Sequence, residues 1–337
     1  MGVNISELFQ AQDVKLTDLS NRIIGIDGHN VSYQFLARIR NSETGDPLRD
    51  QQGRVTSHLS GIFYRTSSLV EAGIKPLFVW DGTPPKLKEK TIRERRAVRE
   101  LAEKRWIEAL GRGEEVMVYA QSASKLTSVM IDESIELLDY MGIPSIKAPS
   151  EGEAQLARMA FEGDIWATAS QDWDSLLFNS PRLVRNLSIT GQRKLPHKHV
   201  FVEIKPELVE LNRNLANLEI TREQLIILGI LVGTDYNSGI KGIGPKTALH
   251  LVKEYKTLDR VLQHVEGIVG DVDQIFNFFL NPPTTKVYEI KWKEPNKEKL
   301  IEFMVEKRNF SRIRVEKVLK SLYDHLVVTR SLDSYFL

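Results

Sequence analysis

The segment DIWATASQDWDSLL, residues 164–177, decides the fold because it joins a buried strand to a pair of acidic side chains. Its first part is a short apolar run of the kind that forms a strand inside a sheet. Asp172 and Asp174 follow, separated by one residue. A second acidic pair, Glu151 and Glu153, stands in PSEGEAQ at 149–155. What these pairs do depends on where the fold places them.

Further apolar runs alternate with helical patterns along the chain. Strands are predicted in RIIGID (22–27), KPLFVWD (75–81) and GIPSIKAP (142–149), and in RLVRNL and HVFVEI near 183–204. Residues 56–72 and 125–141 have helical spacing between them. This alternation is typical of βαβ units, so we predict an α/β fold with a central, mostly parallel twisted sheet and helices on both faces. From about residue 220 the pattern is helical.

Acidic side chains stand at the carboxyl ends of the predicted strands. Asp27, Asp81 and Asp172 each end a strand, and Asp174 follows two residues later. Glu151 and Glu153 begin the helix after the strand at 142–149. Open parallel sheets place their ligand sites at this edge. The two acidic pairs are therefore predicted to be parts of one cluster.

Each acid also has a purely structural interpretation. Asp27-Gly28 and Asp81-Gly82 are turn dipeptides, and Ser150 with Glu153 forms a capping box. Taken together, however, four or more converging carboxylates repel one another and cannot all stay ionised without compensation. Mg²⁺ or Mn²⁺ supplies that compensation through carboxylate oxygens, and two such ions support in-line phosphoryl displacement. We therefore expect two Mg²⁺ ions, replaceable by Mn²⁺, and hydrolysis of a phosphodiester.

The overall composition narrows the class of protein. The 337 residues include no cysteine, which excludes disulfides, zinc–thiolate sites and cysteine nucleophiles and fits a reducing intracellular compartment. The net charge of +1 says nothing by itself about a polyanionic partner. No apolar run approaches the length of about 18 residues that spans a membrane, so we expect no membrane partner.

A basic segment follows Asp81. Residues 86–112 hold ten Lys or Arg against five Glu. A solvated helix with i,i+4 ion pairs is one interpretation. The local excess of five positive charges beside a predicted metal ligand equally favours an element that follows a phosphate backbone.

The motif SGIKGIGPKTALHLVKEY, residues 238–255, predicts a helix, a tight glycine turn and a second helix. It is not a P-loop, because Pro245 stands before Lys246 and a helix precedes it. Gly242 and Gly244 let backbone amides approach a phosphate, with the next helix N-terminus aimed at it. We interpret the motif as a sequence-independent clamp on the DNA backbone; an ordinary helical turn is the alternative.

Six blocks together resemble the flap endonucleases, the structure-specific 5′ nucleases of DNA replication and repair. The blocks, which occur in family order, are IDGHNVSYQFL, TSHLSGIFYRT, FVWDGTPPKLK, GIPSIKAPSEGEAQLA, ASQDWDSLLF and LVGTDYNSGIKGIGPKTAL. The resemblance implies a PIN-like 5′ nuclease fold with a helical arch over the active site and a helix–two-turn–helix motif. It also implies one nuclease domain and a short tail. The implied regions are 1–328 for the whole domain, about 1–105 and 120–260 for its N-terminal and internal parts, about 84–125 for the arch, about 221–256 for the hairpin, and 329–337 for the tail.

The resemblance also implies roles for single residues. The implied metal ligands are Asp27, Asp81, Glu151, Glu153, Asp172, Asp174 and Asp235, the last of which enters through the resemblance alone. Lys88 and Arg95 match arch residues that grip the scissile phosphate, and Tyr33 matches an aromatic that stacks on the terminal base pair. The other implied DNA contacts are Arg40, Arg65, Glu151, Asp235, Gly242, Gly244 and Lys246. The hairpin would hold duplex DNA through a K⁺ ion, although Gly239 stands where some members have a serine and Ser238 is one place earlier.

The last nine residues, TRSLDSYFL, resemble the motif that docks on the sliding clamp (PCNA). Leu332, Tyr335 and Phe336 fit that motif, and Thr329 stands where glutamine is usual. A C-terminal strand that packs on the protein's own core is the alternative. A terminal position favours docking.

The implied function is metal-dependent endonuclease cleavage of 5′ flap DNA near the junction, in Okazaki fragment processing and base excision repair, with 5′–3′ exonuclease activity. The family resemblance further implies a monomer in the cytoplasm or nucleoid of an archaeon. Two alternatives remain: a DNA-junction binding module in which the acids are structural, and a PIN-type ribonuclease, which shares a four-acid sheet edge.

Overall fold

A seven-stranded sheet forms the centre of the computed structural model, which describes residues 2–112, 116–188, 192–194, 201–267 and 270–328. Its strands lie in the order β1-β9-β6-β5-β2-β3-β4. Their bounds are β1 Gln12–Asp13, β2 Ile23–Asp27, β3 Lys75–Trp80, β4 Ser145–Lys147, β5 Ala167–Ala169, β6 Arg182–Arg185 and β9 Glu207–Glu210. A separate pair is formed by β7 Gln192–Lys194 and β8 Phe201–Glu203.

The strands from β6 to β4 run parallel, and the β6–β9 and β9–β1 pairs are antiparallel. The predicted mostly parallel sheet is therefore confirmed. The strand predicted over 164–172 is shorter than expected, because the ladder of β5 ends at Ala169. The next side chain, Ser170, donates to Glu153 Oε1 at 2.7 Å, so the chain leaves the sheet toward the acidic residues.

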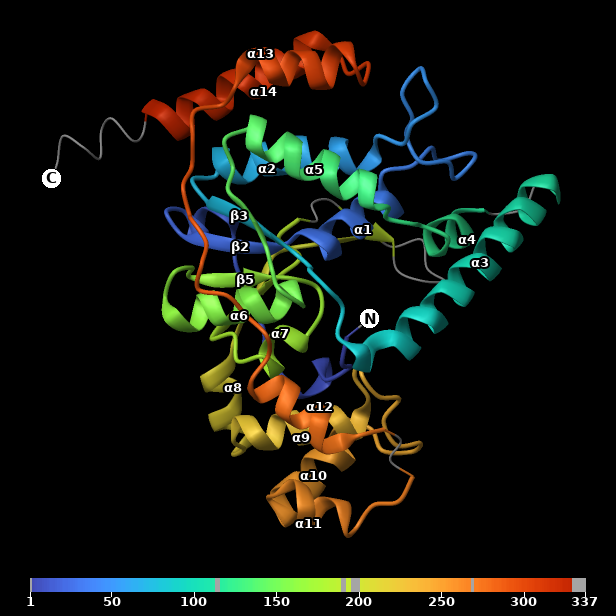
Figure 1. Ribbon diagram of the computed structural model, residues 1–337, viewed down its shortest axis with the longest axis vertical. Helices are drawn as coiled ribbons and strands as arrows, with labels where there is room; N and C mark the ends of the chain where they lie inside the picture. Colours follow the sequence, from blue (N-terminus) through green and yellow to red (C-terminus); the bar gives the residue numbers. More distant parts are fainter. Residues whose placement is uncertain (1, 113–115, 189–191, 195–200, 268–269, 329–337) are drawn as a thin grey trace, which may run out of the picture.

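Helices cover both faces of the sheet (Figure 1). On one face lie α1 Gly28–Arg38, α2 Ser57–Glu71, α5 Ser128–Tyr140, α13 Lys297–Leu300 and α14 Arg312–Tyr323, with the π-helical turns η4 Ile301–Glu306 and η5 Asp324–Val328. On the other lie α6 Gly152–Glu162, α7 Asp174–Leu177 and α8 Leu211–Leu218. The first core joins Ile24, Phe63 and Trp80 to α14, and the second packs α6 and α7 against α9. This burial fixes the strand ends at which the acids stand.

The helical hairpin lies below the sheet in Figure 1. It consists of α9 Arg222–Val232, the turn at 233–244 and α10 Pro245–Tyr255, followed by α11 Leu258–Leu262 and α12 Val272–Leu280. Thr221 and Gln224 form a capping box at the start of α9, and Pro245 is the first residue of α10. The capping box pairs backbone donors at the start of α9, whereas Pro245 fixes the start of α10 with a backbone conformation already suited to a helix.

The predicted arch segment, 84–125, forms a long helix that leans away from the body (Figure 1). It begins with the 3-10 turn η3 Lys86–Lys88 and continues as α3 Glu89–Arg112 and α4 Met117–Ser122. The buried side chains within α3 are Ala102 and Ala109, whereas Val98 is 63% exposed. The foot of this helix starts beside the carboxyl edge of the sheet, so its first basic residues can reach the acids.

Two further 3-10 turns lie near the N-terminus: η1 Ser6–Leu8 precedes β1, and η2 Leu16–Leu19 lies between β1 and β2. The N-terminal residues run past the carboxyl edge, where Val3 is buried against the second core. No helix in the described ranges is long and apolar enough to cross a membrane.

Candidate active site

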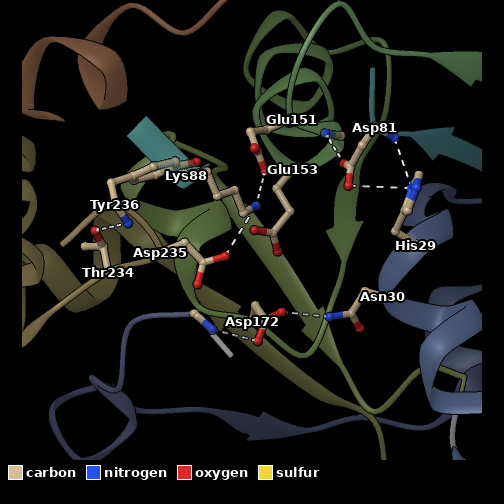
Figure 2. A network of polar contacts seen from close by, with 12 residues as sticks. His29, Asn30, Asp81, Lys88, Glu151, Glu153, Asp172, Thr234, Asp235 and Tyr236 are labelled. Carbon is tan, nitrogen blue, oxygen red and sulfur yellow. Dashed lines mark hydrogen bonds and ion pairs between the residues drawn. The ribbon is translucent and has the colours of Figure 1, made fainter. Parts of the chain in front are cut away.

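Acidic side chains gather at the carboxyl edge of the sheet, as the strand assignments predicted. Asp27 is the last residue of β2, Asp81 follows β3, and Asp172 follows β5. Glu151 is the N-cap of α6, and Glu153 lies in its first turn. Asp174 is the first residue of α7, and Asp235 follows α9 on the opposite side of the cluster (Figure 2).

Lys88 occupies the middle of this cluster. Its Nζ lies 2.6 Å from Glu151 Oε2 and 3.3 Å from Asp235 Oδ2 (Figure 2). Although burial opposes its charge, the carboxylates of Glu151 and Asp235 raise the pKa of Lys88. Arg95 pairs with the other oxygen of Asp235. The two basic residues predicted to grip a phosphate therefore neutralise two of the predicted metal ligands in the DNA-free protein.

The acids that Lys88 does not contact are poorly compensated. Burial raises the pKa of Asp27 well above its ordinary value, and the charge of Asp81 raises it further. Burial, followed by the charges of Asp172 and Asp174, has the same effect on Glu153. The pKa of Asp174 rises to about 7, mainly through burial and then through Asp235. A divalent cation among these side chains would relieve the repulsion.

Neutral donors hold several of the carboxylates in place. Asp81 Oδ1 accepts from Gly152 N at 2.7 Å, and Asp174 Oδ1 accepts from Val3 N at 2.7 Å. Asp172 accepts from Gly2 N at 3.1 Å and from the Asn30 amide at 2.8 Å. Because these donors carry no formal charge, the negative charge of each carboxylate remains available to a cation.

The donor set fits a hard divalent ion. It consists of carboxylate oxygens, the ligands that Mg²⁺ and Mn²⁺ prefer. As the side chains stand, the described residues contain no group of three or more acids or histidines arranged to hold a metal ion. The ammonium group of Lys88 lies between Glu151 and Asp235 and pairs with both, in the place where a cation would bind them.

Sequence reasoning missed three residues at the site. His29 Nδ1 accepts from Asp81 N at 3.1 Å, and burial lowers the pKa of this imidazole. Asn30 contacts Asp172, and the ring of Tyr236 lies 6.0 Å from Lys88 Nζ. Their position in the sequence could have indicated them. His29 and Asn30 follow the predicted ligand Asp27 within three residues, and Tyr236 directly follows Asp235.

Internal contacts hold three of the predicted DNA-binding residues in the DNA-free protein: Tyr33 on α1, Arg40 just after α1, and Arg65 on α2. Tyr33 OH accepts from Arg99 of α3 at 2.8 Å. Arg40 donates to Gly45 O at 2.6 Å and to Ser124 Oγ at 2.9 Å, and it stands over the ring of Trp106. Arg65 donates to the backbone carbonyl of Leu187. Tyr33 and Arg40 are thus tied to the arch segment, whereas Arg65 ties α2 to the residues after β6.

The glycine hairpin has the backbone that its sequence predicts. Gly239 and Gly242 have φ of 70° and 90°, and Gly244 is the N-cap of α10. A Cβ at Gly239 would lie 2.3 Å from Val232 O, so this conformation leaves no room for a serine there. Lys246 is largely exposed, 3.7 Å from Glu7 Oε2. The predicted clamp-binding residues Leu332, Tyr335 and Phe336 lie outside the described residues.

Comparisons with known proteins agree with this geometry. Residues 3–102 match the XPG N-terminal domain, and residues 142–235 match the XPG I-region. The chain is 50% identical over 337 residues to flap endonuclease 1 of Archaeoglobus fulgidus, covering all of both chains. It is 52% identical over 342 residues to flap endonuclease 1 of Pyrococcus abyssi, covering 100% of this chain and 99% of that one.

Solved structures show the same fold. The flap endonuclease-1 of Methanococcus jannaschii superposes with a TM-score of 0.78 at 38% identity, covering 97% of this chain and 100% of that chain. The catalytic core of Rad2, solved in complex with a DNA substrate, gives a TM-score of 0.69 at 25% identity, with 94% and 97% of the two chains covered.

Proposed function

The chain belongs to the flap endonuclease family, and we propose that it cuts 5′ flap DNA near the junction of single strand and duplex. The observation that carries this function is the position of seven carboxylates at or near the carboxyl edge of the sheet, where Lys88 and Arg95 of the arch segment pair with two of them. Cleavage of flaps serves Okazaki fragment processing and base excision repair in this family. A 5′–3′ exonuclease activity, acting at DNA ends, uses the same site.

We propose Mg²⁺ as the cofactor, with Mn²⁺ able to substitute. The residues that would hold it are Asp27, Asp81, Glu151, Glu153, Asp172, Asp174 and Asp235. When bound, the ions neutralise the phosphodiester and activate water for in-line attack. The raised pKa of Asp27, Glu153 and Asp174 supports this assignment, because a cation restores the ionised form of each.

Lys88 and Arg95 face the position where a scissile phosphate would lie. In the DNA-free protein they neutralise Glu151 and Asp235. With cations held by these acids, both basic side chains would be available to the phosphate. They then stabilise the charge that develops on its oxygens during cleavage.

The remaining DNA contacts are proposed for a substrate whose scissile phosphate lies beside Lys88 and Arg95. Tyr33, at the foot of the arch, would stack on the terminal base pair, with Arg40 and Arg65 on the substrate side. The amides around Gly242 and Gly244, with Lys246, would hold the downstream duplex. A K⁺ ion bound by backbone carbonyls near Gly239 would strengthen that grip. We propose that the protein acts as a monomer, inside an archaeal cell.

The test of the function is a labelled DNA flap incubated with purified protein and Mg²⁺. We expect a cut within a few nucleotides of the junction and an intact flap when EDTA replaces Mg²⁺. A flap that is bound but stays intact in Mg²⁺ would favour the DNA-junction binding module. Faster cutting of the matching RNA flap than of DNA would favour the PIN-type ribonuclease.

A separate prediction concerns the tail, residues 329–337. We propose that Leu332, Tyr335 and Phe336 dock on the sliding clamp, because a terminal peptide with a hydrophobic and two aromatic anchors fits a groove on a partner. Deleting 329–337 is expected to abolish stimulation by the clamp and to leave basal flap cleavage unchanged. Stimulation that survives the deletion would show that another surface meets the clamp.

A further inference from the structure

Asn30 touches two predicted metal ligands at once. Its side-chain amide donates to Asp172 Oδ2 at 2.8 Å, and its backbone N–H donates to Asp27 Oδ1 at 2.9 Å (the first contact is drawn in Figure 2). Asp172 lies in a loop after β5, whereas Asn30 lies in the first turn of α1. Its amide therefore ties a loop carboxylate to a helix anchored in the core.

The orientation of the Asn30 amide is itself determined. Its Oδ1 accepts from the side-chain amide of Gln34, one turn later on α1, and from Gln171 N at 3.4 Å. Because two N–H donors face that oxygen, the NH₂ group must point to Asp172. Gln34 Oε1 in turn accepts from Ser188 Oγ at 3.1 Å. The contacts form a relay from Ser188 through Gln34 and Asn30 to Asp172.

The relay lines part of a small, partly open pocket of about 10 Å³, together with Ser170. This volume holds at most about one water molecule. The side chains therefore have little room to adopt other rotamers. An asparagine and a glutamine four residues apart often stabilise a helix and nothing more. Here, in contrast, the last acceptor of the relay is Asp172, a half-buried carboxylate that is predicted to bind metal.

We propose that Asn30 is a positioning residue for Asp172, and that Gln34 positions Asn30. The amide holds the carboxylate in one orientation toward the cation site while leaving its negative charge intact. A lysine or arginine in that place would hold the carboxylate but also compete with the metal. This inference rests on the proposed function, because it takes Asp172 to be a metal ligand. Partners of this kind typically change metal affinity or activity by 10- to 100-fold.

The first test replaces Asn30 with leucine, which has a similar shape and no hydrogen-bonding group. We expect the Mg²⁺ concentration for half-maximal flap cleavage to rise by about 10- to 100-fold. Mn²⁺ affinity of the DNA-free protein, measured by electron paramagnetic resonance, is expected to fall by a similar factor. Flap binding in EDTA is expected to stay unchanged, since Asn30 does not lie in the hairpin.

The second test replaces Gln34 with glutamate, which is isosteric. A carboxylate at this position accepts from the Asn30 NH₂ group and turns that amide, so that its oxygen faces Asp172. The expected loss of Mn²⁺ affinity is similar to that of Asn30→Leu, although Gln34 does not contact the acid. A purely structural role for Asn30 would lower the melting temperature without this shift in metal affinity.

The control is Asn212→Leu, which removes an exposed asparagine on α8 and should leave Mn²⁺ affinity at the wild-type value. The inference would be overturned if a folded Asn30→Leu protein, or the Gln34→Glu protein, bound Mn²⁺ with wild-type affinity. If Asn30→Leu does not fold, the Mn²⁺ affinity of Gln34→Glu decides the question. Wild-type protein that binds no Mn²⁺ would overturn it as well. Wild-type protein that binds Mn²⁺ but leaves flaps intact would overturn the proposed function, while the Mn²⁺ titrations would still test Asn30.

Discussion

Replacing Asp172 with asparagine is expected to reduce flap cleavage by about 10²- to 10³-fold, the scale on which loss of one preorganised electrostatic contact acts. The change removes a negative charge from the proposed cation site. It also places an NH₂ group where the carboxylate now accepts from Gly2 N and from the Asn30 amide. One donor must then face another, so the new side chain also loses its orientation.

Flap binding should survive this change. The hairpin at 233–244 and the basic residues of α3 do not depend on Asp172. Affinity is measured with a labelled flap in EDTA, and cleavage is measured in a single turnover with Mg²⁺. Asp132→Asn, at an exposed position on α5, is the matched control and should cleave like the wild type. An Asp172→Asn protein that cuts at the wild-type rate would remove Asp172 from the catalytic site.

The sequence predicted the scaffold of the site because its determinants are local. The runs at 22–27 and 75–81 are apolar enough to be buried strands, and each ends in an aspartate. Parallel pairing then brings Asp27 and Asp81 to one edge, as the register of β2 with β3 confirms. The positions of Asp27 and Asp81 thus follow from strand ends alone.

The contacts among these side chains could not be predicted from neighbouring residues in the sequence. Gly2 and Asn30 reach Asp172 across 170 and 142 residues of sequence, so no spacing rule could pair them. The internal contacts of Arg40 and Arg65 likewise depend on how a loop and a distant carbonyl pack. The resemblance assigned both arginines to DNA; the DNA-free structure shows what holds them before a substrate arrives.

Asp235 is a site residue that reasoning from the strand ends did not find. It follows a helix rather than a strand, so the strand-end argument did not find it. Its carboxylate nevertheless faces the cluster, where Lys88 and Arg95 pair with it. A buried acid at this position would be unfavourable without a cation. In the DNA-free state two arch residues therefore act as the counter-charges of Asp235, so a metal ion has to compete with Lys88 and Arg95 for this carboxylate.

That competition gives the second large effect. Lys88→Met is expected to slow single-turnover cleavage by about 10²- to 10³-fold, because a cation that stabilises developing charge is lost. At the same time it should tighten Mn²⁺ binding to the DNA-free protein by at least about tenfold. Opposite charges about 4 Å apart interact by about 4 kcal/mol at an effective dielectric of 20, and the metal no longer has to displace such a pair.

The two halves of this prediction separate it from simple damage to the site. A misfolded site would lose both activity and metal affinity. Lys88→Met should instead lose activity and gain metal affinity, which also distinguishes it from Asn30→Leu, for which metal affinity should fall. Lys90→Met is the control, since Lys90 is 64% exposed and pairs only weakly with Glu94 at 3.9 Å. Stability supplies a second readout. Without Lys88, Glu151 loses its lysine partner and Asp235 keeps only Arg95. The melting temperature in EDTA should therefore fall, and the gain on adding Mg²⁺ should grow. If Lys88→Met binds Mn²⁺ no more tightly than Lys90→Met, the ammonium group does not stand in for the metal, and its contact with Glu151 serves only to hold the foot of α3.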